Sequence, residues 1–245
     1  MHTVYVTKKI KSTLNVYIEE SVTSTNDVMK EESYKPFDVL ISKIQTLGKG
    51  RGDNAFVSNE GGLYMSILIP DNGKVGEIVT PLAGVAVART LAEYGVVARL
   101  KWVNDVFVRD KKICGILAER IEKDGKGFIV LGIGLNVNNS DFGTLGSVAT
   151  SMRLVTGADG YRISDILASL LDNITELLHS TKKEIIGAYR DLSMLTGKKV
   201  LVNETKEIVT VKGIDDNAYL VIETAKGTRT LLSGSITLLN IWEYK

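Results

Sequence analysis

The pattern of hydrophobic and polar positions predicts a mixed α+β body followed by a strand-rich C-terminal segment. Apolar runs of strand length, bounded by turn residues, recur through the first 140 residues. These runs predict strands within residues 1–20, at 39–44, at 63–69 and over much of 96–137, with turns at 109–110 and 123–127. Strands and helices do not alternate regularly here, which disfavours a doubly wound parallel sheet.

Four segments carry helix signals. Ser24 to Asp27 looks like a helix cap, with helical residues continuing to about Ser33. Thr80-Pro81 is typical of a helix start, with proline at the first helical position, and Gly95 is typical of its end. Apolar residues at helical spacing predict a long amphipathic helix after Ser164 and a second helix at 183–192.

From Thr196 onward the pattern changes to short strands joined by hairpin turns. The predicted strands are 200–202, 208–211, 219–222, 230–232 and 236–239. Closely spaced strands of this kind predict a small β-barrel appended to the α+β body. We therefore expect two domains, a larger one at 1–192 and a smaller one at 193–245.

Composition narrows the function classes. The chain has 245 residues, 44% of them hydrophobic, and a net charge of +1, so no global basic field favours nucleic acid. Cys114 is the single cysteine, which suggests a reducing compartment. No apolar run approaches the ~20 residues of a membrane helix, and no secretory signal is evident, so we expect a cytoplasmic protein. With two histidines, a zinc site or a Ser-His-Asp nucleophile is improbable.

Two glycine-rich segments are candidates for ligand binding. Gly48 to Gly52 reads GKGRG, and its backbone N–H groups with Lys49 and Arg51 could hold an anion. A solvated loop with two surface cations explains the same residues equally well. Residues 132–138 read GIGLNVN, which indicates a buried strand whose glycines admit a close neighbour. Taken alone, tight strand packing explains this segment better.

A third candidate is KWVND at 101–105, followed by Lys112. The spacing from Asp105 to Lys112 suits a hairpin, which would bring Asn104, Asp105 and Lys112 toward one site. A solvated face of lysines is the alternative, although Trp102 between charged residues fits that alternative poorly. Cys114 lies in an apolar run and is interpreted as an inert core residue.

Together these segments resemble the biotin–protein ligase family. The resemblance rests on the order and spacing of several motifs across nearly the whole chain. They are Ser24-Thr25-Asn26, Gln45, GKGRG at 48–52, KWVND at 101–105, Lys112 with CGIL at 114–117, GIGLNVN at 132–138 and LLSGSITLL at 231–239.

This resemblance implies a catalytic core like that of class II aminoacyl-tRNA synthetases, with a mixed sheet, and an SH3-like C-terminal domain. It implies ATP-dependent activation of biotin to biotinyl-5'-AMP and transfer to a lysine of a biotin carboxyl carrier protein. ATP and Mg²⁺ are the implied co-substrate and metal, no tightly bound prosthetic group is expected, and a homodimer is common in the family. Few residues precede Ser24, so we expect a monofunctional ligase without the DNA-binding domain of some members.

The resemblance also assigns site residues. Arg51, Lys112 and Asp105 are the expected catalytic groups, the first two as contacts to phosphate and carboxylate. Metal ligands are not assigned. The expected biotin and adenylate contacts are Ser24, Thr25, Asn26, Gln45, Gly48, Lys49, Gly50, Arg51, Trp102, Asn104, Lys112, Gly115, Gly132, Gly134 and Asn136.

Some residues depart from the family pattern. Asp53 to Phe56 replaces a further Gly-Arg and a Trp, which affects the expected closure of segment 48–60 as a lid. Val103 replaces a proline, and Lys49 stands where arginine is more common. Two alternatives stay open: a lipoate or octanoate ligase of related fold, and a non-catalytic biotin-sensing protein. The uncharged residues 24–26 and Gln45 disfavour the first, and retention of Arg51 with Lys112 disfavours the second.

Overall fold

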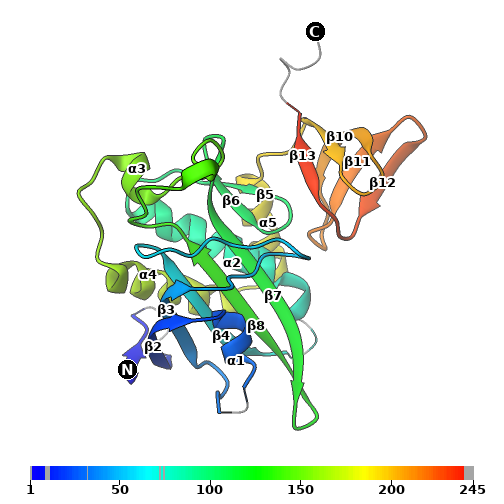
Figure 1. The fold of residues 1–245 in the computed structure, drawn as a ribbon. Helices are drawn as coiled ribbons and strands as arrows, with labels where there is room; N and C mark the ends of the chain where they lie inside the picture. Colours follow the sequence, from blue (N-terminus) through cyan, green and yellow to red (C-terminus); the bar gives the residue numbers. More distant parts are fainter. Residues whose placement is uncertain (1, 9–11, 32, 72, 74, 240–245) are drawn as a thin grey trace.

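An eight-stranded mixed sheet forms the larger part of the fold in this computed structural model, which describes residues 2–8, 12–31, 33–71, 73 and 75–239 (Figure 1). The strand order is β1-β2-β3-β4-β8-β7-β6-β5. All neighbours pair antiparallel except β2 and β3, which are parallel. The strands are β1 (His2–Val6), β2 (Thr13–Val22), β3 (Val39–Gln45), β4 (Leu63–Pro70), β5 (Arg99–Lys101), β6 (Asp105–Val108), β7 (Lys111–Lys123) and β8 (Lys126–Leu135). The predicted α+β class, strands and turns are confirmed, while residues 9–11 of the predicted first segment lie outside the described residues.

The central strands are buried on both faces, because each face meets a different layer. Ile129, Leu131 and Ile133 of β8 belong to a large core on one side. Val130, between them, packs on the other side with Met29. This alternation follows from the two-residue side-chain period of a strand, so every even-numbered residue of β8 faces the layer that contains Met29.

Helices cover the two faces unequally. The first face carries α2 (Val75–Glu93), which contacts both α4 (Ile163–Leu178) and α5 (Lys182–Leu192) (Figure 1). Among the described helices, the short α1 (Thr25–Met29) is the one on the second face, beside β3, β4 and β8. Besides these, α3 (Met152–Thr156) and a 3-10 turn (Gly143–Leu145) lie beyond the end of β8. The thin cover on the second face leaves room for a cavity there.

Three predictions about helices were wrong in part. α2 begins at Val75, so Pro81 lies inside the helix and not at its first position. Ile78 and Val79 pack into the core and stabilise the helix upstream of Pro81. This packing compensates for the stability lost because proline has no N–H to donate. By length and composition α2 could also cross a membrane, contrary to the sequence prediction that no apolar run is long enough. However, 67% of its most apolar stretch is buried inside the protein, as in a core helix. α1 ends at Met29, and the Ser24 side chain caps no N–H of it.

The C-terminal strands form a separate five-stranded antiparallel sheet, in the order β12-β11-β10-β9-β13. The strands are β9 (Lys199–Val202), β10 (Glu207–Ile214), β11 (Leu220–Thr224), β12 (Gly227–Leu231) and β13 (Ile236–Leu238), close to their predicted positions. This confirms the predicted small β-rich C-terminal part, although within the described residues β12 and β13 do not pair. The domain boundary after residue 192 remains a prediction.

Side chains of the larger part hold this second sheet in place. The Trp102 indole Nε1 donates to the Ala218 carbonyl at 3.0 Å, in a buried position. Arg190 of α5 donates from Nε to the Ile214 carbonyl at 2.7 Å and also pairs with Asp216. Apolar residues of β9, β10 and β11 join the same core as those of α2. The second sheet is therefore packed directly on the larger part.

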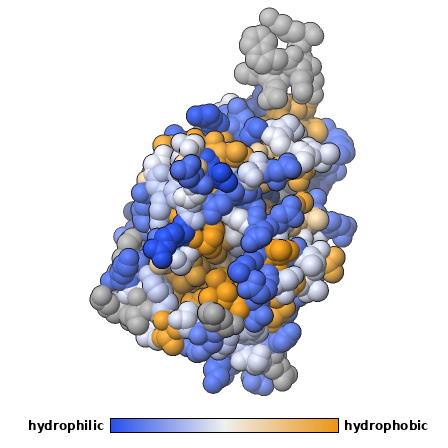
Figure 2. Space-filling model, turned by 60° about the vertical axis from the view of Figure 1, so that its left-hand side comes forward, coloured by the Kyte–Doolittle hydropathy of each residue, from blue (hydrophilic) through white to orange (hydrophobic). Residues whose placement is uncertain are grey.

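The protein has an apolar cavity away from α1, in addition to the cavity beside α1 that is described below. On the face in Figure 2, hydrophobic side chains gather in a depression. A cavity of about 700 Å³ lies between β1, β2 and β3 and the first turns of α4, with Val4, Ile18 and Leu167 in its lining. It shares no described lining residue with the cavity beside α1.

Candidate functional site

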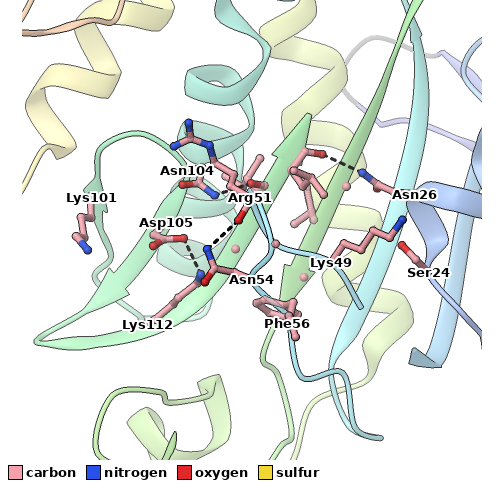
Figure 3. A pocket seen from close by; sticks show the side chains of 18 of the residues that line it. Ser24, Asn26, Lys49, Arg51, Asn54, Phe56, Lys101, Asn104, Asp105 and Lys112 are labelled. Carbon is pink, nitrogen blue, oxygen red and sulfur yellow. Dashed lines mark hydrogen bonds and ion pairs between the residues drawn. The ribbon is translucent and has the colours of Figure 1, made fainter. Parts of the chain in front are cut away.

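A cavity of about 370 Å³ lies on the α1 face of the large sheet, beneath the glycine-rich loop (Figure 3). Fourteen of the predicted residues line it: Ser24, Thr25, Asn26, Gln45, Lys49, Gly50, Arg51, Trp102, Asn104, Asp105, Lys112, Gly115, Gly132 and Gly134. Motifs separated by more than a hundred residues in the sequence therefore meet at one place.

Uncharged polar side chains form one end of this cavity. Gln45 Oε1 accepts from the Thr25 backbone N–H at 2.8 Å and lies 3.0 Å from the Thr25 hydroxyl. Gln45 Nε2 donates to the Ser58 hydroxyl at 2.7 Å. Because the backbone N–H can only donate, it fixes the Gln45 amide with its oxygen toward α1. This end therefore presents rigid, neutral hydrogen-bonding groups.

Glycines form the floor of the cavity, because neighbouring side chains occupy the space that a Cβ at these positions would need. A Cβ on Gly132 would lie 2.1 Å from Asn26 Oδ1, and one on Gly134 would lie 2.5 Å from the Phe56 ring. Phe56 also rests on Gly115, where a Cβ would lie 2.9 Å from the ring. The paired glycines of β7 and β8 thus allow Asn26 and Phe56 to lie directly on the sheet.

Cations dominate the opposite end, where Arg51, Lys101 and Lys112 lie near Asp105 (Figure 3). The fourth basic residue of the lining, Lys49, lies at the α1 end, where it pairs with Asp27. Asp105 is the only carboxylate among its described lining residues. Burial lowers the pKa of the Lys101 amine, which Asp105 opposes and the nearby charge of Lys112 reinforces. Such an excess of positive charge beside a neutral polar end suits a ligand with one uncharged and one anionic part.

The predicted hairpin brings its three residues together. Lys112 Nζ lies 2.7 Å from Asp105 Oδ1 across β6 and β7, and 5.6 Å from the centre of the Phe56 ring. Asn104 Nδ2 donates to the Ile116 carbonyl at 2.9 Å, which holds the start of the hairpin. The peptide bond between Trp102 and Val103, just upstream of this hairpin, is cis.

The glycine-rich loop is a compact turn folded over the cavity. The Phe56 N–H donates to the Gly48 carbonyl at 2.8 Å, and the Gly50 N–H donates to the Asn54 carbonyl at 2.7 Å. Arg51 Nη1 donates to the Gly234 carbonyl at 2.9 Å. The loop therefore reaches the second sheet, and the residues around Gly234 close one side of the cavity.

An ion pair also ties this loop to α1. Lys49 Nζ lies 2.6 Å from Asp27 Oδ2, and Lys30 Nζ lies 3.1 Å from Asp27 Oδ1. Burial by itself would raise the pKa of the Asp27 carboxyl, but its hydrogen bonds to Lys49 and Lys30 outweigh burial and lower it. Asp27 is thus a stable anion that anchors the loop at neutral pH.

Two predicted contacts lie outside the cavity lining. Asn136 is buried and donates from Nδ2 to the Thr150 carbonyl, and its contact with a ligand stays a prediction. Gly48 lies next to the lining, with Ser58 and Phe56 filling the space beside it. Cys114 is fully buried, and burial raises the pKa of its thiol, in agreement with an unreactive core residue.

Sequence reasoning missed several residues around the site. Ser66 of β4 donates to Asn26 Oδ1 at 2.6 Å, and Glu119 of β7 accepts from Asn26 Nδ2 at 2.8 Å. The segment 234–236 lines the cavity from the second sheet. Ser66 was detectable as a polar residue inside an apolar strand. The other contacts depend on strand register and on the packing of the two sheets, which no local pattern reveals.

The described residues build no dedicated metal site. No three His, Cys, Asp or Glu side chains gather at ligand spacing within them. The cavity's single carboxylate, Asp105, is already paired with Lys112. Mg²⁺ prefers carboxylate and phosphate oxygens, so a metal at this site would need a bound nucleotide for most of its ligands.

Sequence comparisons find related proteins over both parts of the chain. The model of the Biotin/lipoate A/B protein ligase family matches residues 17–136, and the Biotin protein ligase C terminal domain matches residues 196–239. A bifunctional ligase/repressor BirA of Bacillus spizizenii is 30% identical over 215 residues, covering 82% of this chain and 66% of that protein. A biotin--[acetyl-CoA-carboxylase] ligase of Mycobacterium tuberculosis is 27% identical, covering 82% of this chain and 79% of that protein. The chain thus spans about two thirds of the length of the Bacillus relative.

Solved structures agree with these matches. A biotin protein ligase from Aquifex aeolicus, in complex with biotin and ATP, superposes with a TM-score of 0.82. The two chains are 30% identical, and the match covers 91% of this chain and 98% of the other. The similarity therefore extends over both sheets and the cavity between them.

Proposed function

The chain belongs to the biotin/lipoate A/B protein ligase family, and on that premise we propose that it activates biotin with ATP and transfers the biotinyl group to a lysine of an acceptor protein. The observation that carries this proposal is the division of the cavity. One end is polar, with its one cation, Lys49, paired to Asp27, and the other has three cations against one carboxylate.

The neutral end suits the ureido ring of biotin, which has one hydrogen-bond acceptor and two N–H donors and no charge. Asn26 and Gln45 offer amide groups of fixed orientation, and Thr25 adds a hydroxyl. Groups of this kind reject analogues that cannot pair with them, because a buried polar atom would lose its partner. An acyl chain that ends in a methyl group or a cyclic disulfide gives them fewer partners.

The cationic end suits the first chemical step. A carboxylate oxygen of biotin attacks the α-phosphorus of ATP, and the bond from that phosphorus to pyrophosphate breaks. Both reactants are anions, so Arg51 and Lys112 offset their repulsion and the charge that develops in the transition state. Lys101 adds to the same positive field. Mg²⁺ accompanying ATP would neutralise further phosphate charge when bound.

The second step uses Asp105, the acidic partner of Lys112 in the ion pair. The amine nitrogen of the acceptor lysine attacks the carbonyl carbon of biotinyl-5'-AMP, AMP leaves, and the amine releases a proton. We place Asp105 beside the incoming amine, where it orients that nitrogen. The loop at 48–60 acts as the lid that protects the mixed anhydride from water.

The acceptor we propose is a biotin carboxyl carrier protein. This part of the proposal is supported by the similarity to the mycobacterial biotin--[acetyl-CoA-carboxylase] ligase. A homodimer, which the family resemblance implies, and a cytoplasmic location, which the composition suggests, also stay predictions, as does the absence of a nucleic-acid partner.

The transfer step is tested with a carrier domain that has a single acceptor lysine. Incubation of the protein with ATP, biotin and this domain should add one biotinyl group, detected by mass spectrometry of the intact domain. A carrier with that lysine replaced by arginine is the control and should stay unmodified. Equal labelling of both carriers would contradict specific transfer.

A further inference from the structure

The Asn26 side chain crosses three neighbouring strands at the neutral end of the cavity. Ser66 of β4, Gly132 of β8 and Leu117 of β7 form one cross-strand row. The Asn26 amide lies over Gly132, because that residue has no Cβ to exclude it. Figure 3 shows Asn26 reaching from α1 toward the backbone of β7. The amide therefore contacts all three strands at the floor of the cavity, which Asn26, Leu117 and Gly132 line.

The surroundings of this amide determine which of its ends is the nitrogen. Nδ2 lies 2.8 Å from Glu119 Oε2 and 3.3 Å from the Leu117 carbonyl, and an ionised carboxylate and a carbonyl can only accept. The amide oxygen lies 2.6 Å from the Ser66 hydroxyl, which donates to it. Turning the amide over would place an oxygen against a carboxylate. The oxygen of Asn26 is therefore held as an acceptor above the floor of the cavity.

Glu119 is itself held by a cation on α1. Lys30 Nζ lies 2.9 Å from Glu119 Oε1, the oxygen that Asn26 does not use. Both side chains are about two thirds buried, at 31% and 30% exposure. Burial would lower the pKa of Lys30, but its bonds to Glu119 and Asp27 raise it instead. The carboxylate therefore has one oxygen committed to a cation and the other to Asn26.

We infer that Glu119 is a positioning residue that fixes the Asn26 amide oxygen toward the ligand, so that the site selects a neutral head group with an N–H donor there. This inference rests on the proposed function and deepens it, because a ureido ring carries such an N–H. Glu119 is not among the described residues that line the cavity. Its effect belongs to recognition of the head group and not to the chemical step.

The test compares Glu119→Gln with Glu122→Gln, an exposed carboxylate on the same strand. In Glu119→Gln the new amide turns its oxygen toward Lys30, so its NH₂ faces the NH₂ of Asn26 and favours the reversed Asn26 amide. We expect KM for biotin in ATP–pyrophosphate exchange to rise about tenfold, the loss of roughly one hydrogen bond. KM for ATP and kcat should stay within about twofold, and Glu122→Gln should match the wild type.

A second variant separates positioning from general damage. Adding Lys30→Met to Glu119→Gln frees the glutamine oxygen to accept from Asn26 again, so KM for biotin should return most of the way to the wild-type value. A biotin methylated on its ureido nitrogens supplies a further readout. Its Kd, measured by calorimetry, should differ little between wild type and Glu119→Gln, because it lacks the N–H.

The outcomes distinguish the inference from the proposed function. An unchanged KM for biotin in Glu119→Gln, an equal rise in KM for ATP, or no recovery in the double variant would overturn the role of Glu119 while leaving the ligase function intact. A wild-type protein that shows no exchange with biotin would overturn the proposed function, and the inference with it.

Discussion

At the residue scale, the site depends on charged groups held in a partly buried environment. Lys112 and Asp105 form an ion pair 2.7 Å long at the cationic end, and Lys101 lies beside them with a lowered pKa caused by burial. The sequence motifs predicted the first pair, because a hairpin of that spacing places both residues on one side. They did not predict the burial of Lys101, which depends on how the two sheets pack.

Lys112→Ala should abolish adenylate formation. The variant removes the cation that faces the reacting anions, and we expect pyrophosphate exchange to fall at least about a hundredfold. The matched control is Lys111→Ala, the neighbouring lysine, whose Nζ donates to the Gly146 carbonyl away from the cavity. Full exchange activity in Lys112→Ala would remove the anion-binding argument.

Lys101→Met should stabilise the protein at neutral pH and weaken ATP binding. Burial lowers the folded-state pKa, so a charged Lys101 costs stability below that pKa, and the cost disappears as pH rises toward the unfolded value of 10.5. We expect Tm to rise by about 2–4 °C at pH 7, with the difference shrinking toward pH 10. A lower Tm for the variant, or a difference that does not change with pH, would be the contrary result.

At the element scale, the glycine-rich loop and α1 show what a local pattern can and cannot predict. Alternating glycines and cations made the loop a candidate for ligand binding, and the loop does line the cavity, while anion binding by it stays a prediction. Its contact with the second sheet, from Arg51 to the Gly234 carbonyl, was not, because the two residues are 183 positions apart. The early start of α2 was missed because Thr80-Pro81 imitates a helix start, while the packing of Ile78 and Val79 extends the helix upstream.

Arg51→Gly should release biotinyl-5'-AMP into solution. The variant loses a cation of the cavity and the bond that joins the loop to the second sheet. We expect free adenylate to accumulate several times faster than with wild type, measured by mass spectrometry after rapid filtration. Arg51→Lys keeps the charge without the planar guanidinium and should give an intermediate rate. Retention of the adenylate for as long as in wild type would contradict the role of the loop.

At the scale of the whole molecule, the two sheets share one hydrophobic core and one cavity. Residues of β9, β10 and β11 join the core that contains α2, and the segment 234–236 closes the site. The existence of a small β-rich C-terminal part was predicted from closely spaced short strands. Its strand order and its attachment through Trp102 and Arg190 required the structure, because these contacts join segments distant in sequence.

Trp102→Phe tests this attachment. The indole donates to the Ala218 carbonyl in a buried position, so the variant leaves that carbonyl without its partner. We expect the free energy of unfolding to fall by about 1–3 kcal/mol in urea titrations. Tyr94→Phe, an aromatic change away from this contact, should alter it by less than about 0.5 kcal/mol. Equal stability of Trp102→Phe and wild type would show that the indole bond does not hold the sheets together.

The most direct test of the central claim is ATP–pyrophosphate exchange by the purified protein with biotin, lipoate and octanoate in parallel. The division of the cavity into a neutral polar end and a cationic end predicts exchange with biotin alone, together with biotinyl-5'-AMP in the mass spectrum. Exchange with lipoate or octanoate would assign a different acyl substrate to the same fold. Biotin binding without exchange would contradict catalysis and leave a biotin-sensing protein as the explanation.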